Sequence, residues 1–588
     1  MTVLSKPDVP RAFAFLFLLL PCIVAASLPT SAQTGAEADV ASEPFFEAVD
    51  VEIINVDVRV TGKDGEPIEG LRKEDFVVYR DGAPVEVANF YAVAGGRPVP
   101  VPADAPRSLD PQPEPAPIPT MAEPESQVAP EHRLWVIAYV DNFNLHPIER
   151  NRVLPDLELF LMRAVDAGGR VMVVSYNRSL EMRQPFTDQR QEVALALGAL
   201  RDDAGLASLR RRDQAATLRQ IDEADSPDQA LLIARLYAEE QMNAVGYTVD
   251  ALDRLIETLG GLPGRKALVH VSSGVPMLAG EEMFHAVAEK FGARGAYSQI
   301  PRHDTTRKFE SLDRRANANR VSFYTLDAGG LRGFQFGAAE YGGFVNTKLR
   351  GVLDSVVPEN LQAPLRLMAE ETGGRAIVNR NEVLPALEEV RHDFESFYSL
   401  GISSVDADSG RYHDIKVELR DRVKGTTLRY RSGYRSKSVE TRVRERLRAA
   451  LSYALEENPL AVEVAWGPQQ RQPGGSGYIL PVQLRVPLGE IALMPVGTGR
   501  HEARLKLFVG AVGRDGRVSE IDGAPFGVRL ADENVEAAKR ESLVHTHKLL
   551  LERGRQKVGV AILDVFGSQS SVVTGIVQIG PEDRPDER

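Results

Sequence analysis

Hydrophobic residues change their spacing along the chain, and the change separates regions of different predicted structure. Between residues 132 and 396, short apolar runs alternate with longer segments whose apolar residues recur every three or four positions. The run Leu134–Val140 has no helical period and ends at Asp141 and Asn142. Such runs are typical of strands buried on both faces, and their alternation with amphipathic helices predicts a parallel sheet. We therefore expect residues 132–396 to form an α/β domain with helices on both faces of its sheet.

Further apolar runs in this region predict strands, and the segments between them predict helices. The predicted strands are Leu134–Val140, Arg170–Tyr176, Ala267–Val271, Arg320–Leu326 and Arg375–Val378. The predicted helices are Pro147–Val165, Asp188–Leu200, Pro227–Leu259, Glu281–Phe291, His303–Asn319, Leu361–Thr372 and Glu382–Glu395. Ligands of open α/β sheets bind beyond the carboxyl ends of such strands, so the residues after Val140 are the first place to look for a site.

Two shorter regions, residues 45–94 and 397–435, alternate apolar and polar residues as half-buried strands do. Each region is too small to bury much surface alone. We therefore expect the two to pair, which would make the α/β domain an insertion in one small β domain. Residues 95–131 hold eleven of the 37 prolines and are expected to be an extended linker, with a spacer favoured over a proline-rich partner motif.

The rest of the chain predicts one connecting helix and an all-β region. Residues 438–457 are charged and carry oppositely charged side chains four positions apart, which favours a helix. Residues 458–580 contain several strand-like runs separated by glycine-rich turns. A run of about 120 residues with this pattern predicts a C-terminal β-sandwich. The expected fold class is thus a multidomain protein of α/β and all-β parts.

The N-terminus predicts an exported protein. Lys6 and Arg11 precede the apolar stretch Ala12–Ala26, and small residues follow, which is the order of a signal peptide over residues 1–32. The alternatives are an uncleaved anchor and a lipidated Cys22. No other apolar stretch reaches the roughly 18 residues of a membrane helix, so we expect no stable membrane span after cleavage. Because Cys22 is the single cysteine, the mature chain would lack thiol chemistry and disulfides, and its location would be periplasmic or extracellular.

Charge and motifs narrow the function classes. The formal net charge of −13 argues against a general nucleic-acid or anionic-membrane binder. Arg210–Arg212 form a basic run inside the charged segment Ala204–Ala224, and nearby acids favour a solvated helix face for it. Zinc-protease, phosphate-loop, serine-hydrolase and dinucleotide motifs are not found. His303-Asp304 and His413-Asp414 are expected to be surface pairs.

Three groups of short motifs resemble a known family. They are Val56–Gly65 with Gly70–Phe76 and Tyr79–Gly82; Gly264–Leu268 with Ser272–Gly274; and Phe397–Gly401 with Tyr412–Val417 and Gly433-Tyr434. Together they resemble the bacterial exported proteins with a von Willebrand factor type A (vWA)-related domain, the type abundant in acidobacteria. The resemblance spans about residues 51–434 and implies a Rossmann-like sheet. It also implies a divalent-cation site in many members, built from D-x-S-x-S after the first strand, a later threonine and a further aspartate.

The residues at the implied cation positions depart from that pattern. Asp141 matches the first aspartate, but Phe143 and Leu145 stand where both serines belong, and Ser273 stands where the last aspartate belongs. The threonine position falls on Gly246 or Thr248. We therefore expect a degenerate adhesion site and no cofactor. If Mg²⁺ or Ca²⁺ binds, the expected ligands are Asp141, Asn144 and Thr248.

The favoured function is an exported, non-enzymatic module of the adhesion type that binds an unidentified protein partner and no nucleic acid. The candidate interaction crevice consists of Asp141, Asn142, Asn144, Ser272, Ser273 and Asp327. The first alternative is a metal-dependent vWA adhesin or receptor with a rebuilt cation site. The second is an exported hydrolase that uses Asp327, His270 or His303.

Overall fold

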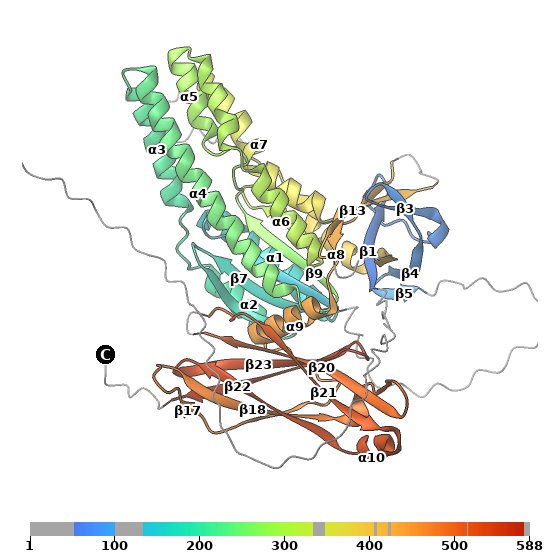
Figure 1. The fold of residues 1–588 in the computed structure, drawn as a ribbon. Coiled ribbons are helices and arrows are strands. Elements are labelled where there is room, and N and C mark those ends of the chain that lie inside the picture. The colour runs from blue at the N-terminus through green and yellow to red at the C-terminus, as the bar shows by residue number, and fades with distance from the viewer. Residues whose placement is uncertain are drawn as a thin grey trace, which may run out of the picture. The chain divides into compact units, whose positions relative to one another are not determined.

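The computed structural model describes six stretches of the chain, shown as ribbon in Figure 1. They are residues 52–99, 133–332, 347–404, 409–420, 425–513 and 516–580. All of them belong to the compact unit Asp50–Arg588. The predicted signal peptide and residues 100–131 of the predicted linker lie outside the described residues.

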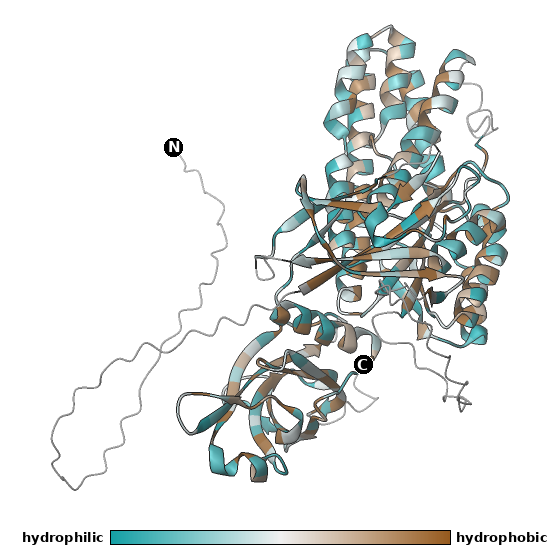
Figure 2. Cartoon of the chain, turned by 90° about the vertical axis from the view of Figure 1, so that its right-hand side faces the viewer, coloured by the Kyte–Doolittle hydropathy of each residue, from teal (hydrophilic) through white to brown (hydrophobic). Residues whose placement is uncertain are grey.

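The centre of the α/β region is a six-stranded, mostly parallel sheet with the order β11-β10-β9-β6-β7-β8. Its strands are β6 (Leu134–Val140), β7 (Arg170–Tyr176), β8 (Leu180–Thr187), β9 (Arg265–Ser272), β10 (Val321–Asp327) and β11 (Arg375–Ile377). Every neighbouring pair is parallel except β7 and β8, which form an antiparallel hairpin. The central strands are hydrophobic along most of their length, as expected for strands covered on both faces (Figure 2).

Helices cover both faces of this sheet. They are α1 (Pro147–Asp166), α2 (Arg190–Leu200), α3 (Ala207–Glu223), α4 (Pro227–Leu259), α5 (Glu281–Phe291), α6 (Thr306–Ala318), α7 (Thr347–Glu371) and α8 (Leu384–Glu395). Alternate residues of β6 divide between two cores: Val136 and Ala138 pack with α1, α2 and α8, while Ile137 and Tyr139 pack with α4, α6 and α7. The first turns of α4 pack with α3, α5 and α7 around a third core beyond the sheet (Figure 1).

Two elements of this region differ from the sequence prediction. The edge strand β8 was not expected, because an edge strand with one exposed face lacks the continuous apolar run of its buried neighbours. Helix α7 begins at Thr347 and not at Leu361. Its interior holds Pro358 and Pro364, and proline normally marks the end or a break of a helix.

The segments before and after the α/β region pair into one small β region. It contains β1 (Glu52–Thr61), β2 (Phe76–Arg80), β3 (Ala83–Val85), β4 (Val87–Ala94), β5 (Arg97–Val99), β12 (Phe397–Ser404), β13 (Tyr412–Leu419), β14 (Thr427–Arg429) and β15 (Gly433–Arg435). The sheets have the orders β14-β1-β12-β4-β5 and β15-β13-β2-β3 and share one hydrophobic core. Since β1 lies between β12 and β14, neither segment completes this core without the other.

The range predicted for the linker, residues 95–131, includes residues that form a turn and a strand. Arg97–Val99 form β5, which pairs with β4. Gly95 and Gly96 make the connecting turn with φ values of 57° and 76°, a left-handed conformation that glycine adopts without steric cost. The linker can therefore begin only after Val99.

Helix α9 (Val439–Tyr453) precedes the C-terminal strands and packs against two cores. Ala449 and Tyr453 join the core on the α4 face of the parallel sheet, while Val443 and Leu447 join a core with β20 and β23. The C-terminal elements are β16 (Glu463–Trp466), β17 (Gln470–Arg471), β18 (Tyr478–Pro487), β19 (Met494–Pro495), β20 (Arg500–Val512), β21 (Asp522–Ala531), α10 (Val535–Ala538), β22 (Ser542–Leu551), β23 (Gly554–Asp564) and β24 (Gln569–Ile579).

The C-terminal strands form two antiparallel sheets around one hydrophobic core. In one sheet β16, β17 and β22 pair with β18, and in the other β19, β21 and β23 pair with β20, followed by β24. Among the described residues, no helix combines the length and the apolar character required to cross a membrane.

Candidate functional site

The carboxyl ends of β6, β9 and β10 bring the predicted site residues to one edge of the parallel sheet. Asp141 follows β6, Ser272 ends β9, and Asp327 ends β10. The sheet order extends from β6 through β7 to β8 on one side and from β9 through β10 to β11 on the other. In open α/β sheets, ligands bind at this reversal of strand order, which here lies between β6 and β9.

Asp141 is completely enclosed and receives its hydrogen bonds from neutral groups. Its Oδ2 accepts from Asn144 Nδ2 at 2.8 Å and from Ser272 Oγ at 3.0 Å, and its Oδ1 accepts from the Asn144 main-chain N–H at 3.2 Å. His270 Nε2 lies 3.7 Å from Oδ2. These donors satisfy the buried carboxylate, as burial of a charge requires.

The predicted metal ligands come together in a form that does not suit a divalent cation. Asn144 Nδ2 donates to Asp141 and lies 3.5 Å from Thr248 Oγ1, so an amide nitrogen stands between the two oxygens. Phe143 and Leu145 are buried in hydrophobic cores. Among the described residues, no group of three or more His, Cys, Asp or Glu could hold a metal ion. Because a hard cation needs several converging oxygens, this set of donors does not fit Mg²⁺ or Ca²⁺.

The Asn142 side chain bonds to residues outside the predicted site. Its Nδ2 donates to Asp203 Oδ2 at 3.1 Å, and its Oδ1 accepts from Arg150 Nη1 at 3.2 Å. Arg150 is fully buried and also donates to the carbonyls of Asp203 and Arg201. Burial lowers the pKa of Arg150, and the charges of nearby aspartates oppose that change. Asn142 is thus part of a structural network under the crevice.

Three arginines converge on this edge of the sheet. Arg210 Nη1 donates to Asn144 Oδ1, its Nη2 donates to Gln241 Oε1, and its guanidinium lies 4.7 Å from the ring centre of Phe143. Arg332 Nη2 donates to Asp327 Oδ1 at 2.7 Å and also to the Ser273 carbonyl. The third is Arg211. The positive charge at this edge therefore comes from guanidinium groups of the protein.

Arg211 belongs to a second ionic group with Glu149 and Ser273. Arg211 Nη2 donates to Glu149 Oε1 at 2.6 Å, and the Ser273 hydroxyl donates to Glu149 Oε2. Burial raises the pKa of Glu149, but Arg211 and the Ser273 hydroxyl lower it more, so the pKa lies below its ordinary value. Glu149 is therefore charged at neutral pH and matches the charge of Arg211.

Arg210 differs from the other two arginines because its partners are neutral. Within the described part of the chain, Arg211 pairs with Glu149 and Arg332 pairs with Asp327, whereas Arg210 contacts only amide oxygens and an aromatic ring. All three arginines line one cavity of about 110 Å³. Its other lining residues are Asn144, Ala207, Gln214, Tyr237, Gln241, Ser273, Gly274, Pro276, Gly280, Glu282, Val357, Asn360 and Leu361.

The predicted crevice therefore has a different composition from the one expected. Asn144 and Ser273 line the cavity, but Asp141, Asn142, Ser272 and Asp327 are at most 1% exposed and lie beneath it. Ser272 bonds to Asp141, whereas Asn142 bonds to Asp203 and Arg150, and Asp327 bonds to Arg332 and Gln362. A partner at this edge would meet the arginines and not the four buried residues.

The residues of the hydrolase alternative are enclosed. His270 is fully buried among Tyr139 and Asp141, and His303 is buried against Phe284 with its Nδ1 3.1 Å from the Gln299 carbonyl. Asp327 is held by Arg332 and by Gln362 Nε2 at 2.8 Å. Each of the three is at most 7% exposed.

The expectation of a solvated face for Arg210–Arg212 is wrong for two of the three residues. Arg212 is exposed, but Arg210 and Arg211 line the cavity because α3 packs along α4 at this edge. Sequence reasoning also missed Glu149 and Arg332. The sequence carries no signal for these contacts, because the direction of a helical arginine depends on how its helix packs against its neighbours.

His413 also departs from the expectation of a surface pair with Asp414. It is buried, and its Nδ1 lies 2.8 Å from Asp81 Oδ2 in the turn after β2. Hydrogen bonding to His413 is the main cause of a lowered pKa of Asp81.

Comparison with known proteins assigns no family to the chain. No protein-family model and no curated protein matches it. One solved structure that matches is the X-ray structure of Northeast Structural Genomics Consortium target SoR45, with 13% sequence identity. The match covers 20% of this chain and 81% of that chain, with a TM-score of 0.13.

Proposed function

We propose that this protein is an exported, non-enzymatic protein-binding module built on a vWA-related domain with a degenerate cation site. The sequence motifs, the strand order around β6 and the position of Asp141 support this proposal. The two C-terminal antiparallel sheets would form a β-sandwich that serves as a spacer. The N-terminal signal would direct the chain to the periplasm or outside the cell.

In this proposal the arginines supply the positive charge that a cation supplies in a metal-dependent adhesion site. A partner would present an acidic side chain to Arg210, the guanidinium whose described partners are all neutral. A guanidinium can bind a carboxylate through two parallel hydrogen bonds, which gives direction as well as strength. The presence of Arg210 in the cavity is the observation that carries this proposal.

Two measurements test the proposal. Envelope proteins from the native cells are passed over the immobilised protein and over its Arg210→Gln and Arg212→Gln variants, with and without a chelator. We expect a protein that is retained by the parent and by the exposed control Arg212→Gln, is lost from Arg210→Gln, and does not depend on divalent cations.

Calorimetry with Mg²⁺, Mn²⁺ and Ca²⁺ separates this mechanism from a metal-dependent adhesin. We expect no heat of binding at millimolar ion. Retention of the partner only in the presence of a divalent cation, or equal retention by all three proteins, would contradict the arginine mechanism.

A further inference from the structure

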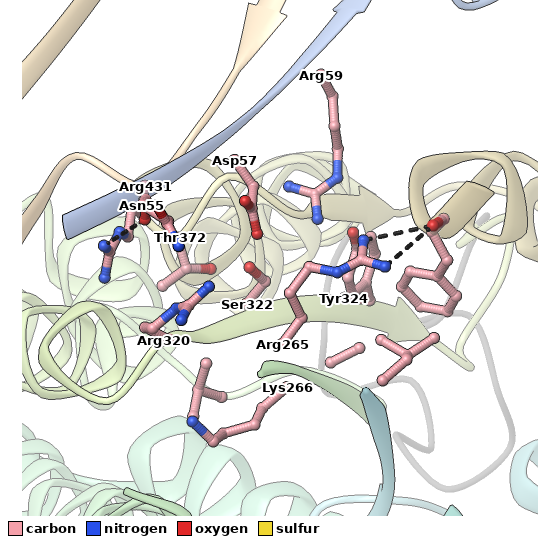
Figure 3. A pocket seen from close by; sticks show the side chains of 14 residues that line it. Asn55, Asp57, Arg59, Arg265, Lys266, Arg320, Ser322, Tyr324, Thr372 and Arg431 are labelled. Atoms are coloured by element: carbon pink, nitrogen blue, oxygen red, sulfur yellow. Dashed lines mark hydrogen bonds between the residues drawn. The ribbon is translucent and has the colours of Figure 1, made fainter. Parts of the chain in front are cut away.

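A second charged cavity lies at the opposite edge of the parallel sheet, where β9 and β10 begin (Figure 3). Arg265 and Lys266 start β9, and Arg320 precedes β10. The strand β1 of the small β region closes the cavity and contributes Asn55, Asp57 and Arg59 from one face. The cavity is therefore formed jointly by the α/β region and the β region.

The lining of this cavity holds five cationic side chains and one carboxylate. The cations are Arg59, Arg265, Lys266, Arg320 and Arg431, and the carboxylate is Asp57. None of the five forms an ion pair with a carboxylate of the described residues. Such a concentration of positive charge is unusual in a chain whose net charge is −13. Arg59 and Lys266 are buried, and buried charges are normally paired.

Four of the cations donate hydrogen bonds to main-chain carbonyls at the C-terminal ends of helices. Lys266 and Arg431 bind the carbonyls of Asn319 and Asn317 at the end of α6. Arg59 binds the carbonyl of Asp393 near the end of α8 and that of Gly373 after α7. Arg265 binds the Phe394 carbonyl in α8, and its guanidinium lies 3.9 Å from the ring centre of Phe397.

These helix ends neutralise only part of the positive charge. Each helix C-terminus is equivalent to about half a negative charge, so three ends and Asp57 offer roughly two and a half negative charges against five positive ones. The remaining positive charge contributes to lowered pKa values of two of the cations. Burial, and next the charge of Arg320, lower the pKa of Arg431 to about 10 and the pKa of Lys266 well below its usual value.

Two donors in the cavity have no partner within the described residues. The hydroxyl of Tyr324 is buried and forms no hydrogen bond. The guanidinium of Arg320 also forms none, and Figure 3 shows it beside Arg431 on one side of Asp57 and Ser322. Arg320 is partly exposed, whereas Tyr324 is 1% exposed. A buried donor without a partner is rare and is informative next to a cavity.

The space suits a small anion with a larger group attached. The cavity volume is about 30 Å³, room for two or three water-sized spheres of about 10–15 Å³ each. An adjoining cavity of about 260 Å³ shares Asn55, Lys266, Arg320 and Arg431 with it. Arg435, Lys437, Arg442 and Arg446 also line that second cavity, and Glu445 is its one carboxylate.

We propose that this cavity binds a dianionic tetrahedral oxyanion, a phosphate or a sulfate, with Arg320 and the Tyr324 hydroxyl as its free donors. The oxyanion is either the free ion or the head of an ester whose organic part occupies the adjoining cavity. A phosphoryl group carries about −1.5 to −2 charges near pH 7, which would offset most of the surplus. This site is separate from the arginine cavity at the carboxyl ends of the strands.

The full chain is titrated calorimetrically with inorganic phosphate, sulfate and, at matched ionic strength, chloride. We expect saturable binding of phosphate or sulfate that chloride does not reproduce. Arg320→Gln should weaken it about 10- to 100-fold, since it removes a charged donor, and Tyr324→Phe about 2- to 10-fold. Both variants should keep the parent's thermal stability in the absence of the anion, because neither side chain makes a hydrogen bond in the structure.

Arg212→Gln is the matched control, since it removes the same charge from an exposed helix position and should leave affinity unchanged. Glucose 6-phosphate distinguishes the sources: tighter binding than inorganic phosphate identifies an ester, and equal or weaker binding identifies the free ion. The proposal is overturned if neither oxyanion binds more tightly than chloride, or if Arg320→Gln and Tyr324→Phe both keep the parent's affinity.

Discussion

Replacing Asp141 by asparagine changes the hydrogen bonding at the carboxyl end of β6 with almost no change in side-chain volume. Asp141 accepts three hydrogen bonds, two of them from Asn144 and one from Ser272. Either orientation of the new amide places its N–H groups against an N–H of Asn144. One charge-assisted hydrogen bond is therefore lost and the others weaken.

A hydrogen bond to a charged group contributes about 1.5–3 kcal/mol. We expect Asp141→Asn to lower the free energy of unfolding of the α/β region by about 2–4 kcal/mol, a factor of roughly 100 in the equilibrium constant. The chain has two tryptophans. Trp135 is buried in β6 and Trp466 lies in β16, so in a Trp466→Phe background the fluorescence in urea reports on the α/β region alone.

Asp188→Asn is the matched control, because Asp188 is exposed and its ion pair with Arg170 is long, at 3.8 Å. It should shift stability by no more than about 0.5 kcal/mol. The reasoning is refuted if Asp141→Asn unfolds at the same urea concentration as its background. It is also refuted if Mg²⁺ stabilises the parent and not the variant, since that result would make Asp141 a metal ligand.

Three further predictions address other parts of the structure. Burial raises the pKa of Asp313 well above its ordinary value, and neither of its oxygens has a hydrogen-bond partner among the described residues. The free energy of unfolding should therefore fall as pH rises through that pKa. In thermal melts, Asp313→Asn should stabilise the protein at pH 8, and this gain should shrink on acidification. A Cβ on Gly261 would lie 2.0 Å from the Glu445 carbonyl oxygen. Gly261→Ala should therefore lower the free energy of unfolding by about 1–3 kcal/mol and speed proteolysis around α9. An unchanged cleavage rate would contradict this packing. A fragment of residues 52–99 should lack dispersed amide NMR signals, because β1 takes its partners β12 and β14 from the other side of the α/β region.

Much of the sheet was predictable because burial on both faces leaves a continuous apolar run. Leu134–Val140 and Arg170–Tyr176 have the bounds that the sequence predicted. The pairing of the two β segments was also predictable, since neither could bury a core alone, and β1 and β12 do pair. The edge strand β8 was missed because one exposed face leaves no such run.

The candidate site was predictable in position but not in composition. The end of an apolar strand identified Asp141, because a run that stops at a polar residue marks the edge of a sheet, and the family resemblance pointed to Ser273. The sequence does not show which way a helical arginine points, so Arg210 was assigned to solvent. Its direction depends on the packing of α3 against α4, and this contact is set by tertiary structure alone.

The pairing of β1 with β12 also has a consequence for biosynthesis. The Ser399 hydroxyl on β12 donates to Asp57 on β1, 342 residues earlier in the chain. At about 5–20 residues per second, a ribosome needs roughly 20–70 seconds to supply that partner. During this interval residues 52–61 lack both of their strand partners, and such an unpaired segment can pair with other chains. The order of synthesis thus exposes the first strand to aggregation until the α/β region has been made.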